Sequence, residues 1–368
     1  MVLYSKLPDN LSLSDVKEDM MKSLNGMTRV LSRTGGVLIL IFFGSAQLLA
    51  DTFPLPPPGD DVVGVVRSVE ARYEDTLLDL ARFNNLGYEE IELANPGVDP
   101  WMPGAGTIVV LPTSFILPPV PREGLVLNVP EMRLYYFPKP KKGARPVVIT
   151  YPVSVGRMDW KTPVGITKVV AKDANPSWSV PETIRAEHAA KGDPLPKVVP
   201  PGPDNPLGRF AMRLGIKGYL IHGTNNPNGL GMRVTHGCMR LYPTDIEALF
   251  KIVPVGTPVR IVNMPFKVGR HAGKIYLETH PPLDEDRARY HNNQIPLVQA
   301  VVAVTHDRNY AVDWEVAEQA AADPLGIPVV IASSPTPEAP AAPAPAEHVN
   351  TIQAKSGHLA KLASSPVR

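Results

Sequence analysis

Cysteine is almost absent from this chain: Cys238 is the only one in 368 residues. A single thiol cannot form an intramolecular disulfide, so a disulfide-stapled fold is excluded. Neither sign of charge is in excess, with 37 Lys and Arg against 36 Asp and Glu, which argues against nucleic acid or an anionic membrane surface as the main partner. The uncharged apolar run Gly35–Ala50 has 16 residues, short of the roughly 20 that a membrane span needs.

That apolar run and its flanks have the layout of a secretory signal. Two arginines precede it and small residues lie near its end, which is the order of the basic, apolar and cleavage regions. We therefore expect residues 1–50 to direct export and the mature chain to act in the periplasm. Two starts, Met1 and Met27, and two cleavage sites, after Ala46 or Ala50, stay open. An uncleaved membrane anchor is the alternative.

Residues 62–113 show the order strand, helix, helix, strand. The expected elements are a valine-rich strand Val62–Arg72, a helix Thr76–Phe83 capped by Asp75, a helix Tyr88–Ala94 and a strand Thr107–Leu111. The runs Asp75–Ala81, Ala94–Pro96 and Val109–Pro112 resemble a LysM module. That resemblance implies binding to glycans that contain N-acetylglucosamine, such as peptidoglycan strands. A structural spacer is the alternative.

From residue 122 onward the pattern changes to short strands separated by turns, which predicts a mainly β domain, a β-sandwich or barrel, over residues 122–264. The expected strands are Gly124–Asn128, Arg133–Phe137, Val147–Val155, Gly165–Lys172, Tyr219–Ile221 and Val259–Asn263. The proline-rich stretch 175–208 is long for a loop inside a compact domain, which favours a lid or a substrate groove. One helix follows the cysteine, with Pro243 in its first turn.

Proline also marks the borders of the predicted units. The segments Phe53–Pro58 and Ser114–Pro121 are expected to be joints on either side of the LysM-like module. Residues 265–332 predict a small α+β appendage, and the Pro- and Ala-rich residues 333–368 predict a disordered tail. The expected elements of the appendage are Lys274–Glu278, Gln294–Val304, Trp314–Ala322 and Ile327–Ile331.

His222 and Cys238 are the residues that carry chemistry. They lie 16 positions apart, and a hairpin-like return over the glycine-rich residues 223–231 would bring them together. A thiol beside an imidazole forms the Cys–His pair of acyl transfer, and Gly237 would let backbone N–H groups approach an oxyanion. A buried structural cysteine is the bland alternative. A zinc site, which needs three or four ligands, lacks the close pairs of Cys or His.

The run Thr235-His236-Gly237-Cys238, with His222 upstream, resembles the signature of the L,D-transpeptidase family and its YkuD-type catalytic domain. The surrounding runs Ile221–Asn225, Gly237–Leu241 and Asn175–Trp178 fit the ErfK/YbiS-like branch. The resemblance implies Cys238 as nucleophile, His222 as general base and acid, and His236 as a residue that shapes the site. It implies substrate contacts from four further residues, Arg240, Gly223, Thr224 and Thr235, although Arg240 could instead tie down its loop.

The resemblance implies a peptidoglycan L,D-transpeptidase without cofactor or metal. Cys238 would attack a tetrapeptide stem after its L-centre, release the terminal D-alanine and pass the acyl group to an amine. The acceptor, a second stem that gives a 3→3 cross-link or a wall-attached lipoprotein, is not written in the sequence. Two alternatives stay open: a thiol peptidase or carboxypeptidase that transfers to water, and a non-catalytic wall-binding protein.

Overall fold

The computed structural model describes residues 51–307 and 310–333. The predicted signal over residues 1–50 and nearly all of the predicted C-terminal tail lie outside these ranges. Within them, no helix is long and apolar enough to cross a membrane.

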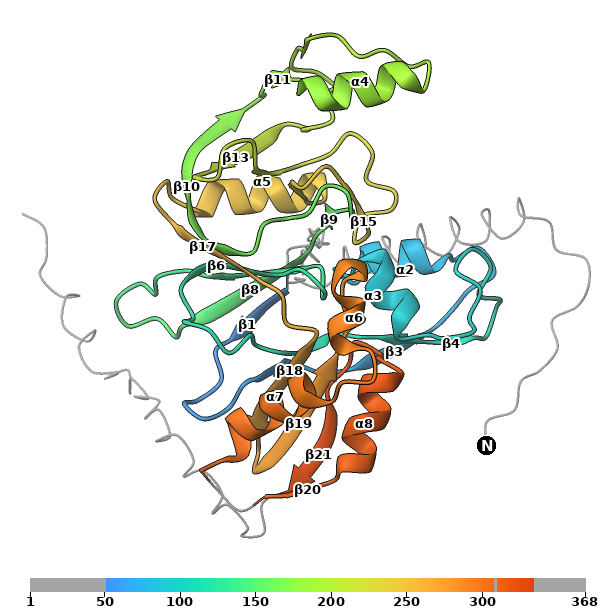
Figure 1. Ribbon diagram of the computed structural model, residues 1–368, viewed down its shortest axis with the longest axis vertical. Helices are drawn as coiled ribbons and strands as arrows, with labels where there is room; N and C mark the ends of the chain where they lie inside the picture. Colours follow the sequence, from blue (N-terminus) through green and yellow to red (C-terminus); the bar gives the residue numbers. More distant parts are fainter. Residues whose placement is uncertain (1–50, 308–309, 334–368) are drawn as a thin grey trace, which may run out of the picture. The chain divides into compact units, whose positions relative to one another are not determined.

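A nine-stranded sheet lies at the centre of the described part of the chain (Figure 1). Its strands follow in spatial order: β1 (Asp51–Pro54), β8 (Val147–Pro152), β7 (Arg133–Phe137), β6 (Gly124–Asn128), β17 (Pro258–Val262), β10 (Gly165–Ala174), β13 (Phe210–Leu214), β14 (Leu220–His222) and β16 (Met239–Arg240). The pairs β6–β17 and β14–β16 are parallel, and the other neighbours are antiparallel. The predicted mainly β fold is therefore confirmed.

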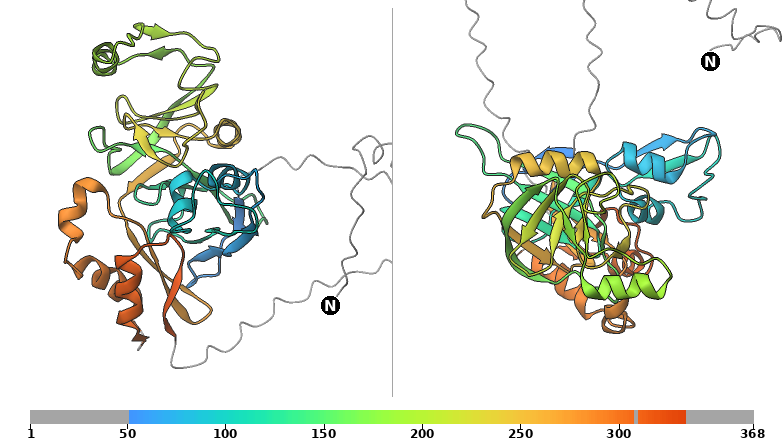
Figure 2. Two further views of the ribbon diagram at one scale, coloured as in Figure 1. Left: turned by 90° about the vertical axis from the view of Figure 1, so that its right-hand side faces the viewer. Right: turned by 90° about the horizontal axis from the view of Figure 1, so that it is seen from above.

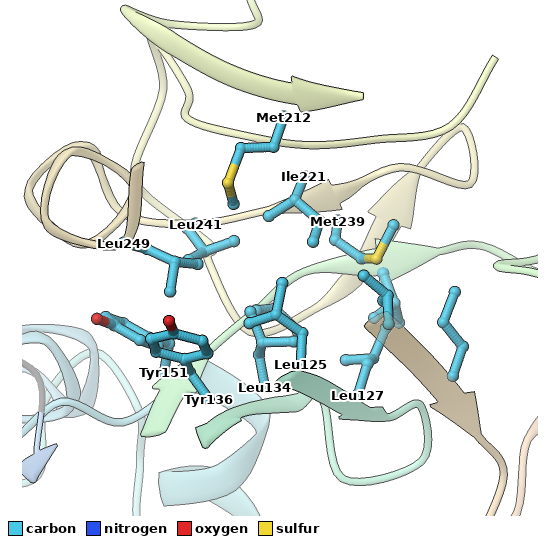
Figure 3. Close-up of a cluster of buried hydrophobic side chains, with 14 of the residues drawn as sticks. Leu125, Leu127, Leu134, Tyr136, Tyr151, Met212, Ile221, Met239, Leu241 and Leu249 are labelled. Atoms are coloured by element: carbon cyan, nitrogen blue, oxygen red, sulfur yellow. The ribbon is translucent and has the colours of Figure 1, made fainter. Parts of the chain in front are cut away.

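The middle of this sheet separates two hydrophobic cores. Every residue of β6 is buried, and successive side chains of a strand point to opposite faces. Leu125 and Leu127 therefore lie in one core, together with Ile221 and Met239 (Figure 3). Val126 lies in a second core, which includes Leu77 and Leu80 of helix α2 (Leu77–Phe83) and Ile91 of helix α3 (Tyr88–Leu93). The first core supports the strands that carry the predicted site.

The strand predicted over Val147–Val155 ends earlier than expected. It breaks after Pro152 and resumes as β9 (Val155–Gly156), which pairs with a different strand, β15 (Arg233–Thr235). Proline offers no N–H to a strand ladder, so β8 cannot simply continue. This break is what brings Gly156 beside the residues that precede Cys238.

The proline-rich residues 175–208 hold more regular structure than the predicted loop. A short pair of strands, β11 (Trp178–Ser179) and β12 (Val198–Val199), flanks the helix α4 (Glu182–Ala190). These elements lie at the outer end of β10 and β13, away from the helices of residues 62–113 (Figures 1 and 2). The helix predicted at Pro243 is confirmed as α5 (Pro243–Ile252), which buries Ile246 and Leu249.

The front segment, defined here as residues 62–113, has the predicted order of elements. They are β2 (Val62–Gly64), β3 (Arg67–Glu70), α2 (Leu77–Phe83), α3 (Tyr88–Leu93) and β4 (Ile108–Leu111). The single strand predicted over Val62–Arg72 is wrong, because Gly64 at φ +73° breaks it. As a result β2 pairs with β5 (Ser114–Ile116), and β3 pairs with β4.

Asp75 does not cap α2, which corrects a second prediction. Thr76 is the N-cap residue, and its hydroxyl accepts a hydrogen bond from the Asp79 N–H at 3.0 Å. Asp75 instead binds the guanidinium of Arg72 at 2.8 Å. Thr76 and Asp75 are both residue types that can cap a helix. The Asp75 carboxylate pairs with Arg72 instead, so Thr76 is the residue that caps α2.

The segments Phe53–Pro58 and Ser114–Pro121 are not the joints that the sequence predicts, because both pack against the sheet. In Phe53–Pro58, strand β1 pairs with β8 at the edge of the sheet. In Ser114–Pro121, Phe115 and Leu117 are buried, because their side chains enter the core between the front segment and the sheet. The front segment therefore packs directly against the sheet.

A buried ion pair joins α3 to β7. Arg133 Nε lies 2.7 Å from Glu90 Oε1, and both side chains are buried. The other guanidinium nitrogens donate to Thr150 Oγ1 at 2.9 Å and to the Asn85 carbonyl at 3.0 Å. The Gly87 N–H donates to the second Glu90 oxygen at 2.6 Å. Because both groups are buried and cannot be solvated by water, each charge depends on the other as its counterion.

The C-terminal segment, defined here as residues 265–333, contains helices and an antiparallel sheet, as its pattern predicts. The sheet order is β18 (Phe266–His271), β19 (Lys274–Thr279), β21 (Val329–Ser333) and β20 (Ala311–Val312). The short helices η1 (Asp284–Asp286) and α6 (Arg287–Tyr290) precede α7 (Ile295–Thr305) and α8 (Trp314–Ala322), and the last two share a core with the sheet. The predicted bounds of α8 are confirmed.

Lys267 on β18 fixes this segment to the rest. Its buried Nζ lies 2.8 Å from a carboxylate oxygen of Glu131 and 2.8 Å from one of Glu278, and it donates to the Ile116 carbonyl. Glu131, Glu278 and His280 are the group of described residues with the spacing of a metal site. Because Lys267 already supplies the positive charge between the carboxylates, this cluster is a structural clamp.

Replacing Glu90 by Gln should lower the free energy of unfolding by about 3–5 kcal/mol, because the Arg133 charge then stays buried without a counterion. Guanidinium unfolding curves would measure the loss. The double variant Arg133→Met with Glu90→Leu should recover most of it, since both charges are gone. A loss of about 1 kcal/mol or less in the single variant, typical of an exposed pair, would contradict the assignment.

Candidate active site

The site is built on the parallel pair β14–β16. Ile221 lies opposite Met239, and His222 lies opposite Arg240. Ile221 and Met239 are fully buried in the core of Figure 3. Because side chains alternate along a strand, His222 and Arg240 point to the other face. Cys238 comes directly before β16, so it lies near both.

The chain does not reach Cys238 by the hairpin-like return that the sequence predicts. It leaves β14, passes through residues 223–232, forms β15 against β9 and only then enters β16 in parallel to β14. A parallel pair needs such a crossover. His222 and Cys238 are therefore neighbours through a crossover connection.

Gly237 makes the turn into the nucleophile position possible. Its φ is +95°, and a Cβ built there would lie 2.7 Å from the Tyr219 ring. The Thr162 hydroxyl donates to the Gly237 carbonyl at 2.9 Å, and the Thr235 hydroxyl donates to the Cys238 carbonyl at 2.6 Å. Backbone conformation and packing both require glycine here. The two hydroxyls hold the turn on either side.

The surroundings of His222 favour its neutral form. The residue is 4% exposed, and burial lowers its pKa to about 4, with a further contribution from the positive charge of Arg240. The carbonyl groups of Gly223 and Leu207 oppose this shift. Nδ1 lies 2.7 Å from the Gly223 carbonyl oxygen. Since a carbonyl only accepts, Nδ1 carries the proton and Nε2 is the basic nitrogen.

The surroundings of Cys238 favour the protonated thiol. Burial raises its pKa, against the opposing effects of the Leu220 N–H and the Arg240 charge. Sγ lies 3.7 Å from the Gly218 carbonyl oxygen, to which it donates. Among the described residues no hydrogen bond joins Sγ to His222. Catalytic hydrogen bonds are often long before a substrate binds. Cys238 and His222 therefore lie on the same face of the sheet without a hydrogen bond between them.

Arg240 brings a positive charge to the same face. Its backbone is fixed by paired hydrogen bonds to Ser154, at 2.9 and 3.0 Å. Its Nε is buried, without a hydrogen-bond partner in the part of the chain that the structure describes. Its charge acts on both His222 and Cys238. A buried donor without a partner costs stability. The role of Arg240 as a substrate contact stays a prediction.

His236 has a partner that the sequence did not reveal. Its Nε2 lies 3.0 Å from Glu187 Oε2 on α4, and its ring lies edge-on to Trp160 with centroids 5.2 Å apart. Burial lowers the pKa of His236, and the Glu187 carboxylate opposes that shift. Glu187 stands in no recognisable motif. Its only sequence signal is its place in a long proline-rich stretch.

The three remaining predicted residues hold the loop. Gly223 packs so closely that a Cβ would lie 3.0 Å from Ile246. The Thr224 hydroxyl closes a turn with Asn226, accepting from its N–H and donating to its carbonyl, both at 3.0 Å. The Thr235 hydroxyl is used by Cys238. Their role as substrate contacts stays a prediction.

Alkylation of Cys238 by iodoacetamide should be slower at pH 7 than alkylation of the same lone thiol in the urea-unfolded chain. The raised pKa leaves less thiolate at neutral pH, so the rate of the folded protein should still be rising above about pH 8.5, where a free cysteine is half ionised. Rates are followed by mass spectrometry. A fast rate that is flat from about pH 5 to 8 would instead reveal a resting thiolate–imidazolium pair.

Known proteins resemble this chain over the residues that carry the site. Residues 122–261 match the YkuD family, the L,D-transpeptidase catalytic domain. The probable L,D-transpeptidase YcfS of Escherichia coli is 44% identical over 64% of this chain and 74% of its own length. The probable L,D-transpeptidase YbiS of the same species is 40% identical over 76% of this chain and 92% of its own.

Among solved structures, L,D-transpeptidase 3 of Mycobacterium tuberculosis aligns with 42% of this chain and 67% of its own, at 22% identity and a TM-score of 0.28. The family assignment depends on the relatives, whose similarity extends well beyond the catalytic domain. On that similarity, the chain belongs to the L,D-transpeptidase family.

Proposed function

We propose that this protein transfers acyl groups from peptidoglycan tetrapeptide stems, with Cys238 as the nucleophile. The thiol attacks the carbonyl that follows the L-centre, the terminal D-alanine leaves, and an amine acceptor takes the acyl group from the thioester. The observation that carries the proposal is that Cys238, His222 and Arg240 lie together, and that the buried Arg240 Nε has no hydrogen-bond partner among the described residues. Family membership supports the same reaction.

His222 moves the protons of the first half-reaction. Its Nε2 takes the Cys238 proton as the sulfur attacks, and then gives it to the departing amine of D-alanine. Its lowered pKa keeps it unprotonated at neutral pH, as a base must be. The Gly223 carbonyl keeps the ring in the tautomer that this role needs. Next to the nucleophile, Gly237 leaves room for N–H groups to approach the oxyanion.

Arg240 is proposed to bind an anionic group of the donor stem. A stem that ends in D-alanine carries a carboxylate close to the bond that breaks. The buried Nε of Arg240 has no internal hydrogen bond to give up when a carboxylate arrives. Charge-assisted hydrogen bonds to a guanidinium are strong and directional. This contact would set the register of the stem against Cys238.

The acceptor is a separate question from the nucleophile. One acyl-enzyme can pass to a second stem as a 3→3 cross-link, to an amine of a wall-attached lipoprotein, or to water as in a carboxypeptidase. Mass analysis of muropeptides made by the purified protein distinguishes these products. A non-catalytic wall-binding protein would release no D-alanine at all.

We further propose that the protein acts in the periplasm and is divided as its sequence suggests. Residues 1–50 would direct export to the compartment that holds peptidoglycan. Residues 122–264 would be the catalytic domain, with the front segment as a LysM-like module and 265–332 as an appendage. Because the segments Phe53–Pro58 and Ser114–Pro121 are packed against the sheet and are not flexible joints, we propose that these parts act as one body.

The front segment is proposed to bind glycan strands through two exposed aromatic residues. Tyr73 is 88% exposed in the loop before α2, and Trp101 is 62% exposed in the loop before β4. The Leu77 N–H donates to the Pro100 carbonyl at 2.9 Å, so the two loops are adjacent. Exposed aromatic faces of this kind can stack on sugar rings. A pure spacer would have no use for them.

Replacing Cys238 by Ala should abolish D-alanine release from a tetrapeptide stem, and His222→Ala should lower the rate at least about 100-fold, the usual scale for a general base. The double variant should be no worse than Cys238→Ala, because nucleophile and base act as a unit. Amino-acid analysis of the released D-alanine measures both. His306→Ala, which changes an exposed histidine far along the sequence, is the control. D-alanine release at a near-normal rate by Cys238→Ala would show that Cys238 is not the nucleophile.

The double variant Tyr73→Ala/Trp101→Ala should pellet less with insoluble peptidoglycan while it processes soluble stems at the wild-type rate. Loss of the glycan contact lowers the effective concentration of the catalytic domain at the wall. Point variants are preferred to deletion of the front segment, which would uncover Arg133 and the shared core. Phe83→Ala, an exposed aromatic on α2, serves as control. Unchanged pelleting would make the segment a structural spacer.

A further inference from the structure

Helix α4 is attached to the rest of the domain through one carboxylate. Glu187 accepts from Arg157 Nη2 at 2.7 and 2.8 Å and lies 3.0 Å from His236 Nε2. Within residues 51–307 and 310–333, every hydrogen bond that joins α4 to residues outside 175–208 ends on Glu187. On the apolar side the helix buries Ile184. Glu187 therefore fixes the position of α4 (top of Figure 1) relative to residues 235–238, which contain His236 and Cys238.

The Glu187 contact also decides the state of the His236 ring. A carboxylate only accepts, so Nε2 carries the proton and Nδ1 keeps its lone pair. In the described part of the chain Nδ1 has no hydrogen-bond partner. A carboxylate that orients an imidazole and leaves its other nitrogen basic is the arrangement of an acid–base pair.

The two imidazoles differ in access. His222 is buried, at 4% exposure of the residue, and its proton is held by a backbone carbonyl. The side chain of His236 is 23% exposed and its proton is held by a carboxylate on a peripheral helix. An acceptor arrives only after the acyl-enzyme has formed, from solvent. His236, two residues before Cys238, is the imidazole that such a second substrate can reach.

We propose that Glu187 is a positioning residue for the amine-transfer half of the reaction, acting through His236. The inference rests on the proposed function, since it presupposes an acyl-enzyme on Cys238. His236 would take one proton from the neutral amine as its nitrogen bonds to the thioester carbon. The carbon–sulfur bond then breaks, and the proton passes to the departing Cys238 sulfur. Amide and thiol are the products, and no other reactant is needed.

Several charges surround the His236 ring. The Glu187 carboxylate and the cation of Arg157 act on it, and His188 lies near enough to contribute. Lys191 also binds Glu187, at 2.7 Å. Of these, the carboxylate raises the pKa of His236, while burial and the Arg157 charge lower it. Removing the carboxylate should therefore lower the pKa of His236 and move the acid limb of the transfer rate to lower pH.

The test compares Glu187→Gln with Glu182→Gln, a matched change on the same helix at an exposed position. Rapid-quench mass spectrometry follows two rates on the full chain with a tetrapeptide stem. One is formation of the acyl-enzyme, and the other is its consumption by an added D-amino acid. For Glu187→Gln we expect formation to change less than threefold, consumption to fall at least tenfold, and its acid limb to move to lower pH. Glu182→Gln should match the wild type.

A second variant separates positioning from folding. In a His236→Ala background, Glu187→Gln should have no further effect on consumption, since Glu187 acts through that ring. Equal losses in both half-reactions, an unshifted acid limb, or a full additional loss in the His236→Ala background would each overturn the proposal. Failure of the proposed function looks different, because the wild type itself would then form no acyl-enzyme.

Discussion

The site depends on one constraint, the parallel register of β14 and β16. Ile221 and Met239 bury their side chains in the core, and this fixes the face on which His222 and Arg240 must lie. A shift by one residue would turn the whole catalytic face into the core. The geometry of thiol, imidazole and guanidinium is thus set by apolar packing beneath them, and the residues between the two strands are free to form a crossover.

That crossover is held by all three segments of the chain. The Tyr88 N–H of α3 donates to the Leu230 carbonyl at 2.9 Å, and the Arg233 side chain binds Glu285 of the C-terminal segment at 3.1 Å. Arg233 also donates to the Gly156 carbonyl, in the strand that pairs with β15. The front and C-terminal segments therefore support the loop that leads to Cys238. The buried ion pairs of Arg133 and Lys267 join the same two segments to the sheet.

Local pattern was enough to predict much of this protein. Strands such as Gly124–Asn128, the helix at Pro243 and the motif around Cys238 are encoded within a few residues of themselves. What could not be predicted depends on distant partners. Alternation alone does not say whether β14 pairs with β16 in parallel, and proline content could not show that Leu117 enters a core. The contact between Glu187 and His236 depends on the position of α4 in the fold, which no local pattern indicates.

The most direct test of the account is to locate the acyl group. The wild type is mixed with a tetrapeptide stem in the absence of an acceptor, quenched in acid, digested and analysed by mass spectrometry. The account predicts the mass of the stem without its terminal D-alanine, attached by a thioester to the peptide that contains Cys238. An adduct on any other residue, or D-alanine release without any covalent species, would contradict it.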